Sequence, residues 1–154
     1  MSHEIDTLIK NLINKTNFHV EDIIVSYDDD THTTWYTIKT TEPRFFIGRD
    51  GETLMALNHL VKRFIEKNST QEILPQYIVD VDGFQKKKID NLKTIAHMMS
   101  ERARYFKSTV EIDPMPAYDR KIIHAFLQNK TDIKTESVGE GKDRRITIKY
   151  IGTI

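Results

Sequence analysis

Two glycines in the segment FFIGRDGETL, residues 45–54, enclose an arginine and an aspartate directly before a leucine-rich helical stretch. Glycine lets the backbone come close to a ligand, and the first N–H groups of a helix favour an anion. Gly48 and Gly51 could therefore approach a phosphate, although most such pairs are simple turns. They do not follow the first strand of a βαβ unit, and the lysine of a Walker-type loop is missing. These two facts exclude the Rossmann and P-loop classes.

A second pair that could contact a phosphate is Arg120 and His124, four residues apart in PMPAYDRKIIHAFLQ. Residues at this spacing lie on one helix face, so both side chains can donate to the same phosphate. A solvated surface pair is the commoner meaning of a bare Arg-x-x-x-His spacing. The flanking segments must therefore decide between the two interpretations.

Composition argues against an enzyme and against a secreted protein. The 154 residues include no cysteine, which excludes disulfides, thiolate zinc sites and cysteine nucleophiles. The six histidines are scattered and none pairs at i,i+4, so we expect no enzyme, no metal site and no cofactor. No apolar run approaches the ~20 residues of a membrane span, and the N-terminus does not resemble a signal peptide. We expect a cytoplasmic globular protein without an integral membrane segment.

Charge is balanced overall but uneven along the chain. Lys+Arg and Asp+Glu both number 23, which argues against a uniformly basic nucleic-acid binder. A solvated helix face is the commoner explanation of a basic run, but such a helix could also lie along a phosphate backbone. Against two acids, residues 84–109 carry seven bases: Lys86, Lys87, Lys88, Lys93, Arg102, Arg104 and Lys107.

The periodicity of apolar residues predicts the elements that hold these groups. Helical spacing indicates helices over residues 3–15, from the glycines to about 67, 84–106 and 117–128. β-Branched and aromatic residues predict a hairpin over residues 22–41, with Pro43 ending its second strand, and strands at 77–83 and 109–113. Two further strands are expected within 132–151, around a glycine-rich turn at 139–142, and a loop at 68–76.

The first half of the chain resembles a KH domain of the type II, bacterial version. FFIGRDGETLMALNHLVKRFIEK resembles that domain's signature, with Ile47 before the GxxG loop of Gly48, Arg49, Asp50 and Gly51. The resemblance implies that the loop clamps the backbone of about four single-stranded nucleotides while an apolar groove, including Leu54 and part of the last strand, receives the bases. Asp50 departs from the basic or neutral residues usual at the centre of this loop.

The second half is similar to the Arg-x-x-x-His (R-3-H) domain. PMPAYDR precedes the helix and TESVGEGKDRR follows it at the distance expected of that domain. The resemblance implies that Arg120 and His124 contact single-stranded nucleic acid, aided by Lys121, Arg144 and Arg145.

This order of domains is that of the Jag (KhpB) family of bacterial RNA-binding proteins, and the chain resembles it over roughly residues 15–151. The resemblance implies an α+β chain: a type II KH domain (helix-strand-strand-helix-helix-strand) at 1–83, joined by a long helix to a small α+β R-3-H domain within 84–154. It also implies a single-stranded RNA-binding protein, or one of single-stranded DNA, acting as a post-transcriptional regulator or RNA chaperone. Many members carry a further N-terminal domain, which this sequence lacks.

A function of another class stays open. KH proteins pair with one another, so the chain could be an adaptor that binds a second small KH protein, or itself, through its first domain. A neutral net charge is compatible with this alternative. RNA binding by the purified protein would distinguish the two functions.

Overall fold

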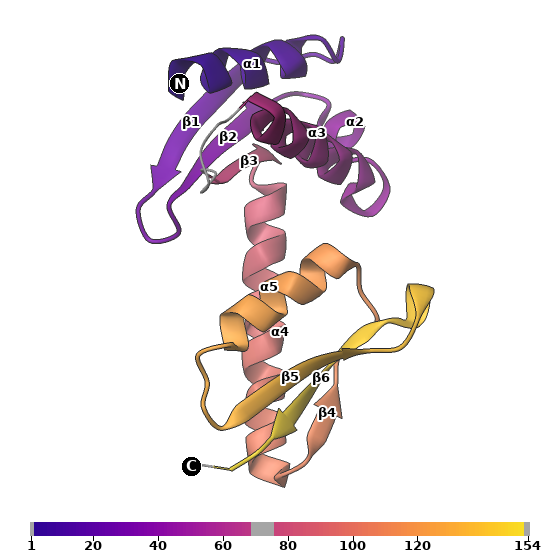
Figure 1. The fold of residues 1–154 in the computed structure, drawn as a ribbon. Coiled ribbons are helices and arrows are strands. Elements are labelled where there is room, and N and C mark those ends of the chain that lie inside the picture. The colour runs from indigo at the N-terminus through magenta and orange to yellow at the C-terminus, as the bar shows by residue number, and fades with distance from the viewer. Residues whose placement is uncertain (1, 69–75, 153–154) are drawn as a thin grey trace. The chain divides into compact units, whose positions relative to one another are not determined.

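The structure is a computed structural model that describes residues 2–68 and 76–152 (Figure 1). The chain separates into two compact units, Met1–Gln85 and Lys86–Ile154, each with its own three-stranded sheet. Helices and small sheets occur in both units, so the predicted α+β class is confirmed. The loop predicted at 68–76 lies almost entirely outside the described residues. Within those residues, no helix combines the length and the apolarity that crossing a membrane requires.

The first unit consists of α1 (Ser2–Asn14), β1 (Asp22–Asp28), β2 (Thr33–Lys39), α2 (Pro43–Ile47), the 3-10 turn η1 (Arg49–Gly51), α3 (Glu52–Asn68) and β3 (Gln76–Val81). β2 lies in the middle of the sheet, antiparallel to β1 and parallel to β3. The apolar pattern did not reveal α2, because five residues are too few to show a period. Pro43 begins this helix, where its missing N–H costs nothing.

Helices α1 and α3 cover one face of the first sheet. In β2, Tyr36 and Ile38 are buried while the residues on either side of them are only partly covered, which is the alternation of a strand with one core face. Their core also contains apolar residues from both helices and from β3: Ile9, Ile13, Leu54, Leu57, Val61, Ile65, Val79 and Val81.

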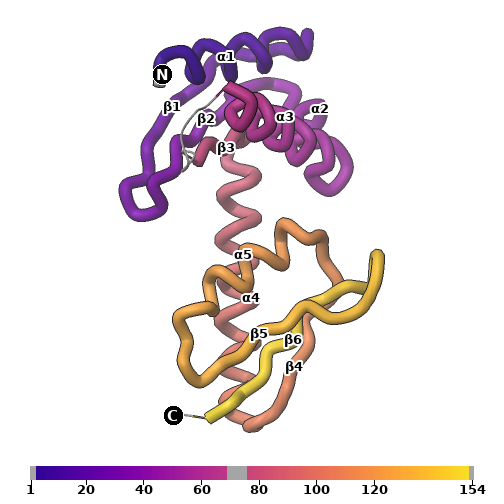
Figure 2. The backbone as a smooth tube through the Cα atoms, in the orientation of Figure 1, coloured from indigo at the N-terminus to yellow at the C-terminus, as the bar shows by residue number. Residues whose placement is uncertain are grey.

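The second unit contains α4 (Phe84–Phe106), whose first two residues belong to the first unit, β4 (Thr109–Glu111), α5 (Ala117–Leu127), β5 (Ile133–Val138), the 3-10 turn η2 (Gly141–Asp143) and β6 (Arg145–Tyr150). The sheet is antiparallel in the order β4-β6-β5. Figure 2 traces the chain from α4 through β4 to α5 and back through the β5–β6 hairpin. The predicted glycine-rich turn is confirmed, and Gly139 adopts a φ of +87° there.

Both helices of the second unit pack on one face of its sheet. Ile146 and Ile148 are fully buried and share a core with apolar residues of α4 and α5. Successive strand side chains point to opposite faces, so Arg145, Thr147 and Lys149 lie on the face away from the helices. This alternation decides which polar side chains share a face with α5.

Candidate nucleic-acid interface

Arg120 and His124 project from α5 beside its buried residues. Ile123 and Leu127 anchor this helix in the core, with 0% and 1% of their surface exposed. Arg120 and His124 are half-buried rather than fully solvated. The Arg120 Nη1 atom donates a hydrogen bond to the Met115 carbonyl at 2.6 Å, which holds the side chain against the segment that precedes the helix.

The imidazole of His124 is fixed by β5. Its Nδ1 atom lies 2.7 Å from the Thr135 hydroxyl oxygen, so Nε2 is the ring nitrogen that can meet a ligand. Burial, together with the charge of Arg120, lowers the pKa of His124 below its ordinary value of 6.5. The ring is therefore mostly neutral at neutral pH, and an anion placed beside both side chains would favour its protonation.

Strand register separates the two arginines at the start of β6. The Arg144 Nε atom donates to the Ser137 hydroxyl at 3.0 Å, and Ser137 pairs with the buried Ile146 on the helix-covered face. Arg145 instead contacts the Glu111 carboxylate at 3.3 Å on the opposite face. The structure thus brings Arg144 to the side of the sheet that carries Arg120 and His124, and it places Arg145 on the other side.

The basic helix α4 is partly neutralised by acids far away in sequence. The Lys88 ammonium lies 3.1 Å from the carboxylate of Asp119, a residue that is only 4% exposed. Arg104 donates from Nε and Nη2 to the two carboxylate oxygens of Asp132, at 2.5 and 2.9 Å. This bidentate contact lowers the pKa of the Asp132 carboxyl group. Lys88 and Arg104 therefore serve the fold, and the helix offers less positive charge to a ligand than the sequence indicates. Lys121 of α5 is exposed.

The glycine loop of the first unit lies between α2 and α3. Gly48 has a φ of +72°, and an added Cβ would come within 2.2 Å of the Thr53 hydroxyl oxygen and 2.8 Å of the Thr53 backbone nitrogen. Gly51 is buried with a φ of +85°, and a Cβ there would lie 3.2 Å from the ring of Phe84. Both glycines are thus required by the fold of the loop itself.

The other predicted loop residues differ in accessibility. Arg49 and Asp50 are exposed, and Asp50 adopts the left-handed conformation (φ 52°, ψ 22°), which aspartate tolerates better than most residues. Ile47 is half-buried against the core. Leu54 is 1% exposed and belongs to that core, so it has almost no surface with which to meet a base.

Some residues that shape these surfaces were not identified from the sequence. Thr135 and Ser137 hold His124 and Arg144, and their signal is a polar residue at alternate positions of a strand whose covered face should be apolar. In the first unit, the rings of Phe18 and Phe45 stack at 5.4 Å, and the guanidinium of Arg44 lies 4.9 Å from the Phe45 ring centre. No sequence period links Phe18 to this pair. Among the described residues, no three metal-binding side chains gather at one point.

Comparison with known proteins identifies the second unit. Residues 90–150 match the R3H domain family, which is the R-3-H domain of the sequence analysis. Residues 90–150 form an R-3-H domain. The match includes α5, β5 and β6, and therefore the cluster of Arg120, His124 and Arg144.

Relatives match a larger part of the chain. The RNA-binding protein KhpB of Clostridium symbiosum is 31% identical over 127 residues, which is 82% of this chain and 56% of that protein. KhpB of Bacillus subtilis is 29% identical over 82% of this chain and 61% of that protein. The chain thus spans little more than half the length of these two relatives. A third KhpB, from Lactiplantibacillus plantarum, is 28% identical over 71% of the chain and 33% of that protein.

Proposed function

We propose that this chain binds single-stranded RNA through its R-3-H domain, with single-stranded DNA as a second ligand to test. The carrying observation is that Arg120, His124 and Arg144 lie on one side of the sheet within the matched domain, tied to it by Met115, Thr135 and Ser137. These contacts limit the motion of three groups that can donate to phosphate oxygens. The names of the KhpB relatives support RNA as the ligand.

In this proposal the phosphate is bound by side chains already held in place. Arg120 has further guanidinium N–H groups besides the one given to Met115, and His124 has Nε2. Lys121 and Arg144 would add positive charge around this point. Arg145 is left out of this contact set, because its side chain lies on the opposite face beside Glu111. An ordered set of donors loses little conformational entropy on binding.

We further propose that the first unit is a type II KH domain whose loop, Gly48 to Gly51, contacts the nucleic-acid backbone. The order helix, strand, strand, short helix, helix, strand and the exposed Arg49 support this assignment. Bases would then meet the surface beside the loop, in which Ile47 is partly accessible and Leu54 is not.

For the protein as a whole, we propose a KhpB-like post-transcriptional regulator or RNA chaperone of the cytoplasm, and not an enzyme. Pairing with a second KH protein, or self-association, stays a prediction of the sequence. An adaptor of that kind would use the first unit as a protein surface and would not need RNA.

A binding measurement tests the main proposal. The whole chain should bind a labelled single-stranded RNA more tightly than a hairpin stem of the same length, because the groups on one small surface reach unpaired nucleotides more readily. Added salt should weaken this binding, with a slope of about 0.7 log units for each phosphate that the protein neutralises. Equal affinity for both ligands, or no binding to either, would reject the proposal.

The loop of the first unit is tested by exchanging its charges. Asp50→Lys should tighten RNA binding about threefold by removing an exposed acid, and it should cost a little stability because lysine tolerates the left-handed conformation less well. Arg49→Asp should weaken binding, since two acids would then be adjacent. If neither substitution changes the affinity, the loop does not contact RNA, and the first unit is better explained as a docking surface.

A further inference from the structure

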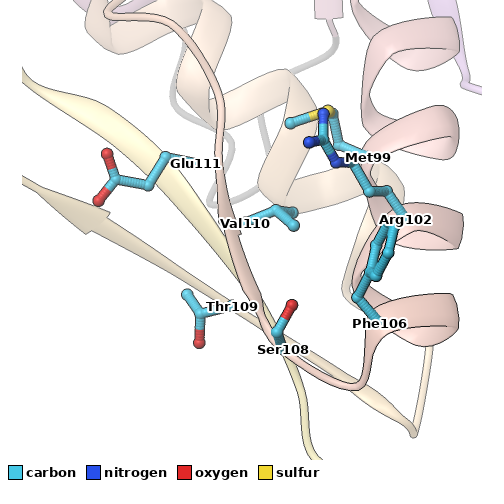
Figure 3. A pocket seen from close by; sticks show the side chains of 7 residues that line it. All are labelled: Met99, Arg102, Phe106, Ser108, Thr109, Val110 and Glu111. Carbon is cyan, nitrogen blue, oxygen red and sulfur yellow. The ribbon is translucent and has the colours of Figure 1, made fainter.

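An open groove of about 420 Å³ lies between the last turns of α4 and the strand β4, inside the second unit (Figure 3). Figure 3 shows Met99, Arg102 and Phe106 on α4, facing Ser108 and Val110. The side chains of Thr109 and Glu111 also line the groove but point away from the helix. None of these residues belongs to the Arg120–His124 cluster. A space of this size accommodates a small planar ligand.

The end of α4 places an aromatic ring at the wall of this groove. Ser108 N–H donates to the Ala103 carbonyl at 3.1 Å and Lys107 N–H donates to the Arg104 carbonyl at 3.2 Å, with Lys107 at a φ of 48°. This is the Schellman arrangement, and it turns the chain sharply from the helix into β4. Phe106, the last helical residue, is left 61% exposed.

The groove offers positive charge and no inward-facing carboxylate. Arg102 has no acidic partner among the described residues, whereas Arg104, two positions along, is bound to Asp132 and Glu101. The carboxylate of Glu111 is turned away and contacts Arg145. A guanidinium next to an exposed ring is the combination that binds the phosphate and the base of one nucleotide.

The free edge of β4 adds directional groups. Ile112 N–H donates to the Ile146 carbonyl at 2.9 Å, and Val110 pairs with Ile148 two positions along. Since antiparallel pairs alternate, the backbone N–H and C=O groups of Thr109 and Glu111 point away from β6. They can hydrogen-bond the edge of a flat ring that enters the groove.

We propose that this groove binds one unpaired base of the RNA. The base stacks on Phe106, its edge meets the backbone of Thr109 or Glu111, and its phosphate lies beside Arg102. This inference rests on the proposed function and adds a second contact point to it. An extended peptide fits less well, because β4 offers only three residues for pairing and the unpaired charge in the groove is a cation.

Tryptophan fluorescence tests the groove directly. Trp35 is the only tryptophan, so Trp35→Phe provides a background without one. In this background, Phe106→Trp should lose at least half of its fluorescence when single-stranded RNA saturates the protein, because a stacked base quenches the indole. Tyr105→Trp is the matched control: Tyr105 is adjacent and 82% exposed but does not line the groove, so its quenching should be much smaller.

Affinity gives the second measurement. Phe106→Ala should weaken RNA binding about tenfold, as the removal of one stacked base does, while Phe106→Tyr should retain it. Equal quenching at positions 105 and 106, or an unchanged affinity of Phe106→Ala in a protein that binds RNA, would overturn the groove and leave the proposed function standing. If the wild-type chain binds no RNA, the proposed function fails, and the ligand of the groove fails with it. Quenching by a protein partner but not by RNA would also overturn the inference.

Discussion

The two candidate binding regions of this chain explain their sequence motifs in different ways. In the first unit, Gly48 and Gly51 are needed because any side chain would meet Thr53 or Phe84, whether or not a ligand is present. In the second unit, the core needs Ile123 and Leu127 of α5 but has no use for the cations beside them. A motif made of glycines can thus be retained for the fold alone, whereas a cluster of ordered cations requires another reason.

Charge strengthens this contrast. The loop presents one cation and one anion, Arg49 and Asp50, both exposed. Near α5, no acid is paired with Arg120 or Arg144 among the described residues, and their hydrogen-bond partners are neutral. We therefore expect the second unit to supply most of the affinity for RNA and the loop to supply less.

The largest effect should come from removing the cluster. Arg120→Ala combined with His124→Ala should weaken binding of single-stranded RNA about 100-fold, since hydrogen bonds involving a charged group contribute roughly 1.5–3 kcal/mol each. The salt slope should fall by about 0.7 for each phosphate that the variant no longer neutralises. Fluorescence anisotropy over a range of salt concentrations measures both quantities. Because the variant also lacks the native bonds to Met115 and Thr135, the melting temperature must be followed in parallel. An unchanged affinity and slope in the folded variant would place RNA elsewhere.

The opposite result is expected for the glycines, where the effect is on stability. Gly48→Ala should lower the free energy of unfolding of the first unit by about 2–3 kcal/mol, because a Cβ at a φ of +72° is strained and also meets backbone. Arg49→Ala, one residue along and exposed, should change it by less than about 0.5 kcal/mol. Trp35 lies in β2, so its fluorescence during urea unfolding reports this unit. Equal stability of the two variants would contradict a structural requirement for Gly48.

The sequence predicted the long elements well and the partners of charged residues poorly. Helix α4 was expected at 84–106 and is found there, because 23 residues display several turns of the helical period. The contact of Arg104 with Asp132 spans 28 positions, and nothing local reveals it. In the same way, Arg144 and Arg145 are indistinguishable as neighbours in the sequence. Only the register of β5 against β6 shows that they lie on opposite faces.

That register gives a prediction for two adjacent arginines. Arg144→Ala should weaken RNA binding about fivefold, because it removes one cation from the side of the sheet that carries His124. Arg145→Ala should leave the affinity within about twofold and cost at most a fraction of a kcal/mol, since its exposed pair with Glu111 contributes little. The two variants have the same net charge, so a general electrostatic effect would weaken both equally. That outcome would mean that the RNA does not distinguish the faces of the sheet.

The smallest effect concerns protons, and stability and affinity should respond to pH in opposite directions. Burial and the charge of Arg120 hold the pKa of His124 below 6.5 in the folded chain. As the pH falls through 6.5, the unfolded chain takes up its proton first, so the free energy of unfolding should decrease until the pH passes the lowered pKa. A bound phosphate has the reverse effect, because it stabilises the protonated ring. RNA affinity should therefore rise across the same pH window, by no more than about tenfold per pH unit for one proton taken up. Anisotropy titrations between pH 7.5 and 5.5, compared with thermal melts in the same buffers, measure the two trends. The variant His124→Gln is the matched control, because it keeps a polar side chain but does not titrate, and it should lose both trends relative to wild type. If the affinity of wild type and variant follows the same pH dependence, another group responds to the proton, and the imidazole of His124 does not contact the phosphate.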